Sequence, residues 1–255
     1  MNDQPQPFVS HIKELRSRLG KVALLFVVVF FALYPFSHEL FNFIADPLAK
    51  LISNQVSERR FIYTELTEAF VTHLKVTAFF AFLMSWPVAA WHVWQFTVPG
   101  LYKHEKRMLT AFLISSPFLF FIGMAFSYFV VFPNAFKFFL SFESMREAGQ
   151  MAIQLEARMA DYLGLCIRLF IVFGLCFQLP LVMLVLHFIF KITVQTFLKT
   201  WRYSVLGIFL VAAIFTPPDA FSMLILAIPL TILYGLSIGL VYFFQTLKIK
   251  EINHA

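Results

Sequence analysis

The chain has 255 residues, of which 60% are hydrophobic and only 13% are charged, and its mean hydropathy is +0.79. Soluble domains are nearer half apolar and a quarter charged, so the composition excludes an ordinary soluble globular protein. The net charge of +6 indicates a membrane surface and not nucleic acid, because the basic residues cluster at the ends of apolar runs, where membrane anchors lie.

The first apolar run, 19–36, follows a polar N-terminal stretch and has no cleavage pattern after it, so we expect a retained membrane span and not a signal peptide. About 20 apolar residues cross a hydrocarbon core of about 30 Å. On this basis the sequence predicts an all-α polytopic membrane protein, formed as one domain over 1–255, with six spans near 19–36, 70–98, 108–132, 162–190, 203–215 and 221–244.

The segments between the spans differ in length and charge. Residues 37–68 and 133–160 are long and mixed, and they are expected to hold short helices, whereas 191–202 is a short basic loop. The fifth span has about 13 residues, or about 20 Å of helix, so we expect local thinning of the bilayer or burial against neighbouring helices there.

Prolines lie in or beside five of the six predicted spans, and each is expected to kink its helix. They are Pro35, Pro87, Pro117, Pro180 and Pro229. Kinked spans with long loops on one side favour a curved bundle with a concave face.

Six spans place both termini on the same side of the membrane, and the distribution of basic residues predicts which side. Twelve of the 20 Lys and Arg residues fall on the side of the termini, seven fall on the opposite side, and Arg168 lies within a span. Cytoplasmic loops carry the excess of Lys and Arg. Both termini are therefore expected in the cytoplasm.

Two acids lie near the membrane on this basic side. Glu14 lies in "HIKELRSRLG" at 11–20, and Glu105 lies in "YKHEKR" at 102–107. Each has a local explanation, because Glu14 can pair with Arg18 one helical turn away and Glu105 with a neighbouring lysine, which contributes about 0–1 kcal/mol. Together they also suit a receptor for a cationic ligand, since a carboxylate binds a guanidinium through two parallel hydrogen bonds.

Three further polar residues fall inside or between spans. Arg168 could extend its side chain to the membrane surface or pair with Asp161, seven residues earlier on the same helical face. Gln178 could hydrogen-bond to another helix, and Asp219, which follows two prolines in "FTPPDAFS", could cap a helix.

Sequence signatures of enzymes are missing. The chain has no H-E-x-x-H, no G-x-S-x-G and no glycine-rich phosphate loop, and its seven histidines are scattered, so we expect no catalysis, no metal and no cofactor. Two other classes stay open from the residues. A secondary transporter of a small solute would show internal repeats or ion pairs within the membrane, and an intramembrane hydrolase would need a reactive Ser–His or metal pair.

Five long motifs resemble TatC, the multi-span receptor subunit of the twin-arginine protein translocase. They are "HIKELRSRL" at 11–19, "VWQFTVPGLYKHEKR" at 93–107, "GMAFSYFVVFPNAFKF" at 123–138, "FGLCFQLPL" at 173–181 and "FTPPDAFSMLILAIPL" at 215–230. The resemblance covers nearly the whole chain. It implies binding of twin-arginine signal peptides at the cytoplasmic face of the membrane. It also implies partnership with TatB-like and TatA-like subunits in a homo-oligomeric complex, and export of folded proteins by the proton-motive force. A bacterial inner membrane is the simpler expectation for the location, and an organelle is the alternative.

The resemblance also implies roles for individual residues. The residues expected to bind the signal peptide are Glu14, Leu15, Arg16, Phe96, Tyr102, Lys103 and Glu105. Pro47 and Asp219 match motif positions in the first and last external loops. Gln178 stands where many relatives have Glu, which leaves hydrogen bonding to a partner helix or to the signal peptide as its expected role.

Overall fold

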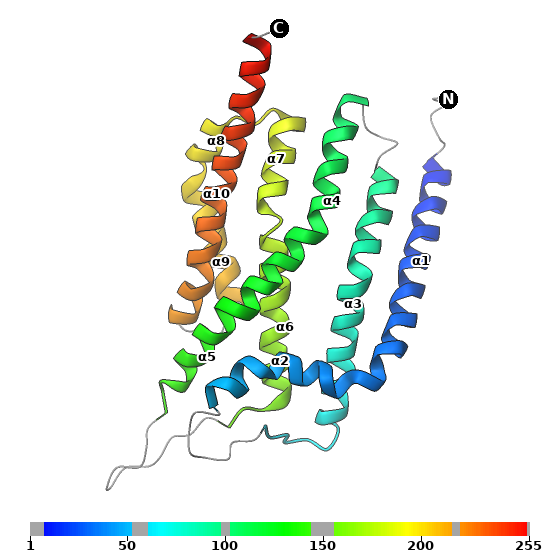
Figure 1. Ribbon diagram of the computed structural model, residues 1–255, viewed down its shortest axis with the longest axis vertical. Helices are drawn as coiled ribbons and strands as arrows, with labels where there is room; N and C mark the ends of the chain where they lie inside the picture. The colour runs from blue at the N-terminus through cyan, green and yellow to red at the C-terminus, as the bar shows by residue number, and fades with distance from the viewer. Residues whose placement is uncertain (1–7, 53–60, 98–102, 144–155, 216–219, 254–255) are drawn as a thin grey trace. The chain divides into compact units, whose positions relative to one another are not determined.

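The computed structural model describes residues 8–52, 61–97, 103–143, 156–215 and 220–253 (Figure 1). Within these ranges the regular structure is helical, apart from one isolated parallel bridge between Ile62 and Arg158. The chain divides into two compact units. The first comprises 1–43 and 65–117, and the second comprises 44–64 and 118–255.

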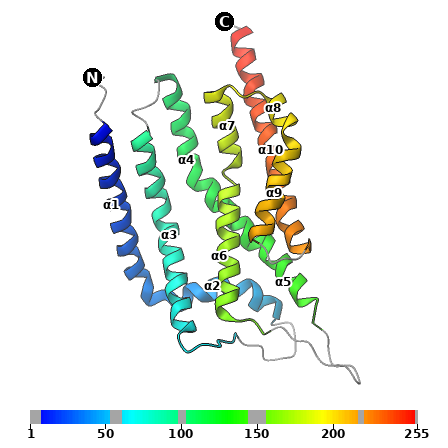
Figure 2. The same ribbon diagram turned by 180° about the vertical axis from the view of Figure 1, so that it is seen from behind.

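The first unit is built on two long helices that pack against each other, α1 (Phe8–Leu33) and α3 (Glu68–Thr97). They run antiparallel in both views (Figures 1 and 2). A short 3-10 helix, η1 (Tyr34–Phe36), follows α1 and contains Pro35. The ring of His73 on α3 contacts that of His38, with their centroids 4.3 Å apart. This contact lies at the end of the unit where α1 ends and α3 begins.

Two helices continue from the first unit into the second. Helix α2 (Ser37–Ile52) contains Pro47, and α4 (Lys103–Phe126) contains Pro117. The π-helix η3 (Ser127–Val131) and α5 (Phe132–Leu140) follow α4 directly. In α5 Pro133 stands in the first turn, directly after the π-helix.

The second unit has an aromatic core around α6 (Met159–Cys176). Phe132 packs on Phe170 at 4.8 Å between ring centroids, and Phe136 packs on Tyr162 at 5.2 Å. The hydroxyl of buried Tyr162 donates to the backbone carbonyl of Ile44 in α2, at 2.8 Å. The many phenylalanines of the sequence therefore fill the space between helices as well as facing lipid.

The remaining helices pack around α10 (Ala220–Asn253), which contacts α7 (Leu179–Phe190), α8 (Val194–Lys199) and α9 (Trp201–Phe215). The ring of Trp201 packs on that of Tyr234 in a tilted arrangement with centroids 5.3 Å apart, and the Tyr234 hydroxyl donates to the carbonyl of Phe197 at 3.1 Å. Lys191, which ends α7, adopts the left-handed conformation with φ of 53°.

Among the described residues, five helical stretches are long and apolar enough to cross a membrane, and α9 is a shorter apolar helix. The five are Lys13–Leu51, Glu68–His92, Ile114–Leu140, Met159–Phe190 and Met223–Thr246. The prediction of an all-helical polytopic membrane protein is confirmed. The helices differ from the predicted runs at several points. The first run ends in η1 and the third contains the π-helix η3, while the fourth breaks between α6 and α7 and α10 continues to Asn253.

Candidate functional site

Glu14 lies in the second turn of α1 and forms the local ion pair that its spacing predicts. Arg18 donates to Glu14 Oε1 from Nη2 at 2.5 Å and from Nε at 2.9 Å. The exposed fractions of the two side chains are 32% for Glu14 and 20% for Arg18. Because both bonds end on Oε1, the second carboxylate oxygen, Oε2, has no partner among the described residues.

Leu15 and Arg16 lie on the neighbouring surface of α1 and are exposed. With Leu19, Gly20 and Ala23 they line a shallow, almost wholly apolar groove. The predicted signal-peptide residues of α1 thus combine a carboxylate with an open apolar surface, which is the chemistry that a peptide with a basic and an apolar part requires.

The other predicted signal-peptide residues lie at helix ends of the same unit. Phe96 is in the last turn of α3, and Lys103 and Glu105 are in the first turn of α4. Their side chains lie outside the described part of the structure, as does all of Tyr102. The beginnings of α1 and α4 and the end of α3 share one end of the first unit (Figures 1 and 2). At the start of a helix, the dipole stabilises a negative charge by about 0.3–1 kcal/mol.

Pro47 and Gln178 belong to the second unit, and Asp219 lies outside the described residues. Pro47 is buried within α2, next to Asp46, which pairs with Lys50 at 2.5 Å and accepts a long hydrogen bond of 3.5 Å from the Tyr128 hydroxyl. Gln178 forms the break between α6 and α7. Its N–H donates to the carbonyl of Leu175, and its own carbonyl accepts from Val182.

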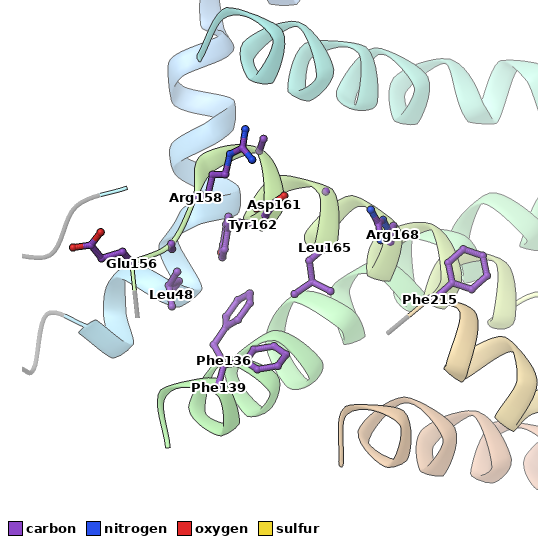
Figure 3. A pocket seen from close by; sticks show the side chains of 13 residues that line it. Leu48, Phe136, Phe139, Glu156, Arg158, Asp161, Tyr162, Leu165, Arg168 and Phe215 are labelled. Atoms are coloured by element: carbon purple, nitrogen blue, oxygen red, sulfur yellow. The ribbon is translucent and has the colours of Figure 1, made fainter. Parts of the chain in front are cut away.

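A pocket in the second unit contains groups that the sequence analysis singled out and did not connect to a site. Arg168 and Asp161 both line it (Figure 3). Of the two alternatives for Arg168, the ion pair with Asp161 does not form, since neither side chain has an ion-pair partner in the part of the chain that the structure describes. Arg168 instead lies back along α6, with Nη2 4.0 Å from the Cβ position of Gly164. In the sequence, the only indication of this pocket was the spacing of the charged residues at 158, 161 and 168.

The described residues include no group of three or more His, Cys, Asp or Glu side chains that could hold a metal ion. Glu14 is the described carboxylate at this end of the first unit, and a carboxylate can bind a cation.

Comparison with known proteins identifies the family. Residues 10–229 match the family described as "Sec-independent protein translocase protein (TatC)". The chain is 41% identical to the Sec-independent protein translocase protein TatC of Rickettsia prowazekii (strain Madrid E), and the alignment covers 97% of each chain. It is 34% identical to that of Escherichia coli (strain K12), with 92% of this chain and 88% of the relative covered.

A solved structure agrees with the sequence comparison. The crystal structure described as "Twin Arginine Translocase Receptor- TatC" superimposes with a TM-score of 0.75 and 30% identity, covering 91% of this chain and 98% of the other. The match extends over nearly the whole of both chains, so it concerns the fold as a whole and not a shared motif. The chain therefore belongs to the TatC family of Sec-independent protein translocase proteins and is a multi-span transport component, not an enzyme.

Proposed function

We propose that Glu14 and Glu105 form the acidic part of the signal-peptide site in this chain, which serves as the receptor subunit of a twin-arginine translocase. Each carboxylate binds one guanidinium of the arginine pair. The observation that carries the proposal is the arrangement of Glu14, whose Oε1 is held by Arg18 while Oε2 has no partner among the described residues.

The existing Arg18 contact favours this function over a purely structural pair. A pair one helical turn apart on a helix surface contributes only about 0.3–0.5 kcal/mol, so Arg18, which is partly buried with Glu14, does little to keep Glu14 from a second cation. By binding one oxygen, Arg18 orients the carboxylate and leaves the other oxygen for an incoming guanidinium. The planar, rigidly forked donors of arginine suit this geometry better than the single ammonium of lysine.

Further residues extend the proposed site. Leu15 on α1 is 45% exposed and supplies apolar contact to the signal peptide, as does Phe96 at the end of α3. Tyr102, which the sequence places between α3 and α4, is proposed to add a further contact to the signal peptide. Arg16 and Lys103 repel cations that lack the paired geometry, because like charges at short range oppose binding.

The proposal is tested by binding of a labelled twin-arginine signal peptide to the purified, detergent-solubilised complex. Glu14→Gln and Glu105→Gln are each expected to weaken binding about ten- to hundredfold, since a hydrogen bond to a charged group is worth about 1.5–3 kcal/mol. Exchanging the charges, with Glu105→Arg in the protein and Arg→Glu in the peptide, is expected to restore part of the affinity lost by Glu105→Arg alone.

Glu39→Gln is the matched control. Glu39 is an exposed acid in the first turn of α2, at the other end of the first unit, so its removal changes the net charge equally and is expected to leave peptide binding unchanged. Affinity that is the same for the Glu14, Glu105 and Glu39 variants would exclude the two acids from the site.

The wider function follows from the same proposal. With TatB-like and TatA-like subunits in a bacterial inner membrane, the chain exports folded proteins by the proton-motive force, and both termini face the cytoplasm. Pro47 and Asp219 contribute to partner contacts or transport, and Gln178 hydrogen-bonds to a partner helix or to the inserted peptide. Deletion of the gene is expected to leave twin-arginine precursors in the cytoplasm, and Gln178→Leu to slow their export. Normal export after either change would contradict the corresponding role.

A further inference from the structure

A pocket of about 570 Å³ lies beside α6 in the second unit (Figure 3). Its apolar wall is made by side chains from α2, α5, α6 and the last residue of α9. These are Leu48, Phe136, Phe139, Leu165 and Phe215. Its polar wall carries charged groups of both signs, Glu156, Arg158, Asp161 and Arg168. A pocket with one apolar and one charged wall suits an amphiphilic ligand.

Arg168 is an unusual residue to find in this position. It lies within the membrane-spanning stretch Met159–Phe190, is exposed, and has neither an ion pair nor a side-chain hydrogen bond to the described residues. Charged groups inside a span are rare because they lose hydration, and they mark functional sites when they occur. No described residue pairs with this exposed guanidinium, so it is available to an anionic ligand at the pocket wall.

The length of the span places Arg168 near a membrane surface. The 32 residues of Met159–Phe190 are about 48 Å long, about 18 Å more than a hydrocarbon core. If the excess is shared between the two ends, Arg168 lies only about 4–5 Å inside the core at the Met159 end. Its guanidinium leans over Gly164 towards that end, so it reaches the level of lipid phosphates.

The order of charges along α6 selects the kind of lipid. Asp161 lies about 10 Å nearer the Met159 end than Arg168, and Glu156 lies beyond it. A ligand here therefore meets carboxylates at the membrane surface, a guanidinium below them, and apolar side chains alongside. An aminophospholipid has the same order, with its ammonium outermost, its phosphate next and its acyl chains beneath.

We propose that this pocket binds an aminophospholipid of the phosphatidylethanolamine class, with its phosphate on Arg168 and its ammonium on Asp161. Phosphatidylglycerol has no cationic group that could bind the carboxylates of Asp161 and Glu156. Phosphatidylcholine has a quaternary ammonium without N–H groups, so it cannot donate hydrogen bonds to them. The charge-assisted bonds of phosphate to arginine and of ammonium to carboxylate together give the selectivity.

The test measures lipid retention by the purified full-length protein. Mixed micelles contain phosphatidylethanolamine, phosphatidylcholine and phosphatidylglycerol with identical acyl chains, and native mass spectrometry counts the lipids that remain bound. The unmodified protein is expected to retain phosphatidylethanolamine in preference to the other two. Arg168→Gln is expected to weaken binding of all three about tenfold, because they share the phosphate. Asp161→Asn is expected to abolish the preference for phosphatidylethanolamine over phosphatidylcholine without weakening the binding of phosphatidylcholine.

Lys137→Gln provides the matched control, since Lys137 is an exposed cation in the last turn of α5 and does not line the pocket. It is expected to bind lipid as the unmodified protein does. Arg168→Gln and Asp161→Asn variants that behave like Lys137→Gln would overturn the proposal. Retention of phosphatidylglycerol equal to or above that of phosphatidylethanolamine by the unmodified protein would also overturn it, and this result needs no variant to fold.

Discussion

Gly123 and Gly174 let α4 and α6 approach each other more closely than any larger residue allows. A Cβ added at Gly123 would lie 2.5 Å from the carbonyl oxygen of Phe173, and one at Gly174 would lie 2.6 Å from the ring of Phe120. Both distances are shorter than van der Waals contact. Small residues at such crossings are typical of membrane helices, which associate through close packing.

Gly123→Ala is therefore expected to destabilise the protein. The added methyl meets backbone at Phe173 and not the end of a flexible chain, so the helices must separate, and overpacking of this kind costs about 1–3 kcal/mol. The midpoint of thermal unfolding in detergent should fall. Gly207→Ala in α9 is the control, because nothing lies within 4 Å of its Cβ position. Equal midpoints for the two variants would show that the α4–α6 contact is looser than described.

The sequence predicted contacts between residues that are close along the chain, but it did not predict contacts between distant residues. The Glu14–Arg18 pair follows from helical spacing alone and is confirmed. Asp161 and Arg168 lie seven residues apart, which is about 10 Å of helical rise, and they form no ion pair. Their distance along the helix is greater than the one turn that separates Glu14 and Arg18. The hydrogen bond from Tyr162 to Ile44 joins residues 118 positions apart, and no local pattern encodes it.

At the scale of the element, hydropathy predicted helices well and their interruptions poorly. Each predicted apolar run contains a helix, because a backbone in lipid must satisfy its own hydrogen bonds. Hydropathy did not show the break at Phe177 and Gln178, but the kink expected from Pro180 falls within two residues of it. Pro180 marks its far side, since a proline is tolerated in the first turn of a new helix.

Helix α9 has 15 residues and is about 22 Å long, which is shorter than a hydrocarbon core of about 30 Å. If the bilayer thins beside it and the thinning aids passage of a folded protein, inserting four leucines between Ala212 and Ala213 should impair export and leave signal-peptide binding unchanged. Precursor processing in cells and peptide affinity of the purified complex are the two measurements.

The control inserts the same four leucines after Thr246, near the end of the 34-residue α10, where length is already in excess. Export is expected to continue there. Normal export with the longer α9 would show that its shortness plays no part in transport, and loss of export in both insertions would point to a general disturbance of folding.

At the scale of the whole molecule, the sidedness of the chain rests on charge and not on packing. The positive-inside bias predicts cytoplasmic termini and a cytoplasmic basic loop around α8, with the segment after α5 on the opposite side. The packing of α6 and α7 against their neighbours is the same in either orientation, because the contacts within a helical bundle do not depend on which leaflet is cytoplasmic.

Cysteine labelling in intact cells decides the orientation. In a background with Cys166→Ala and Cys176→Ala, Ser141→Cys at the end of α5 and Gln195→Cys in α8 each place one thiol at an exposed position. Once the outer barrier is opened, a membrane-impermeant maleimide should label the thiol at 141 and should reach that at 195 only after the inner membrane is permeabilised. Helices α6 and α7 together cross the membrane once between positions 141 and 195. If they span the membrane, the two thiols must therefore lie on opposite sides. The reverse pattern would place the basic loop around α8 on the outer side of the membrane, together with the proposed site of Glu14 and Glu105. A receptor for cytoplasmic precursors could not work there.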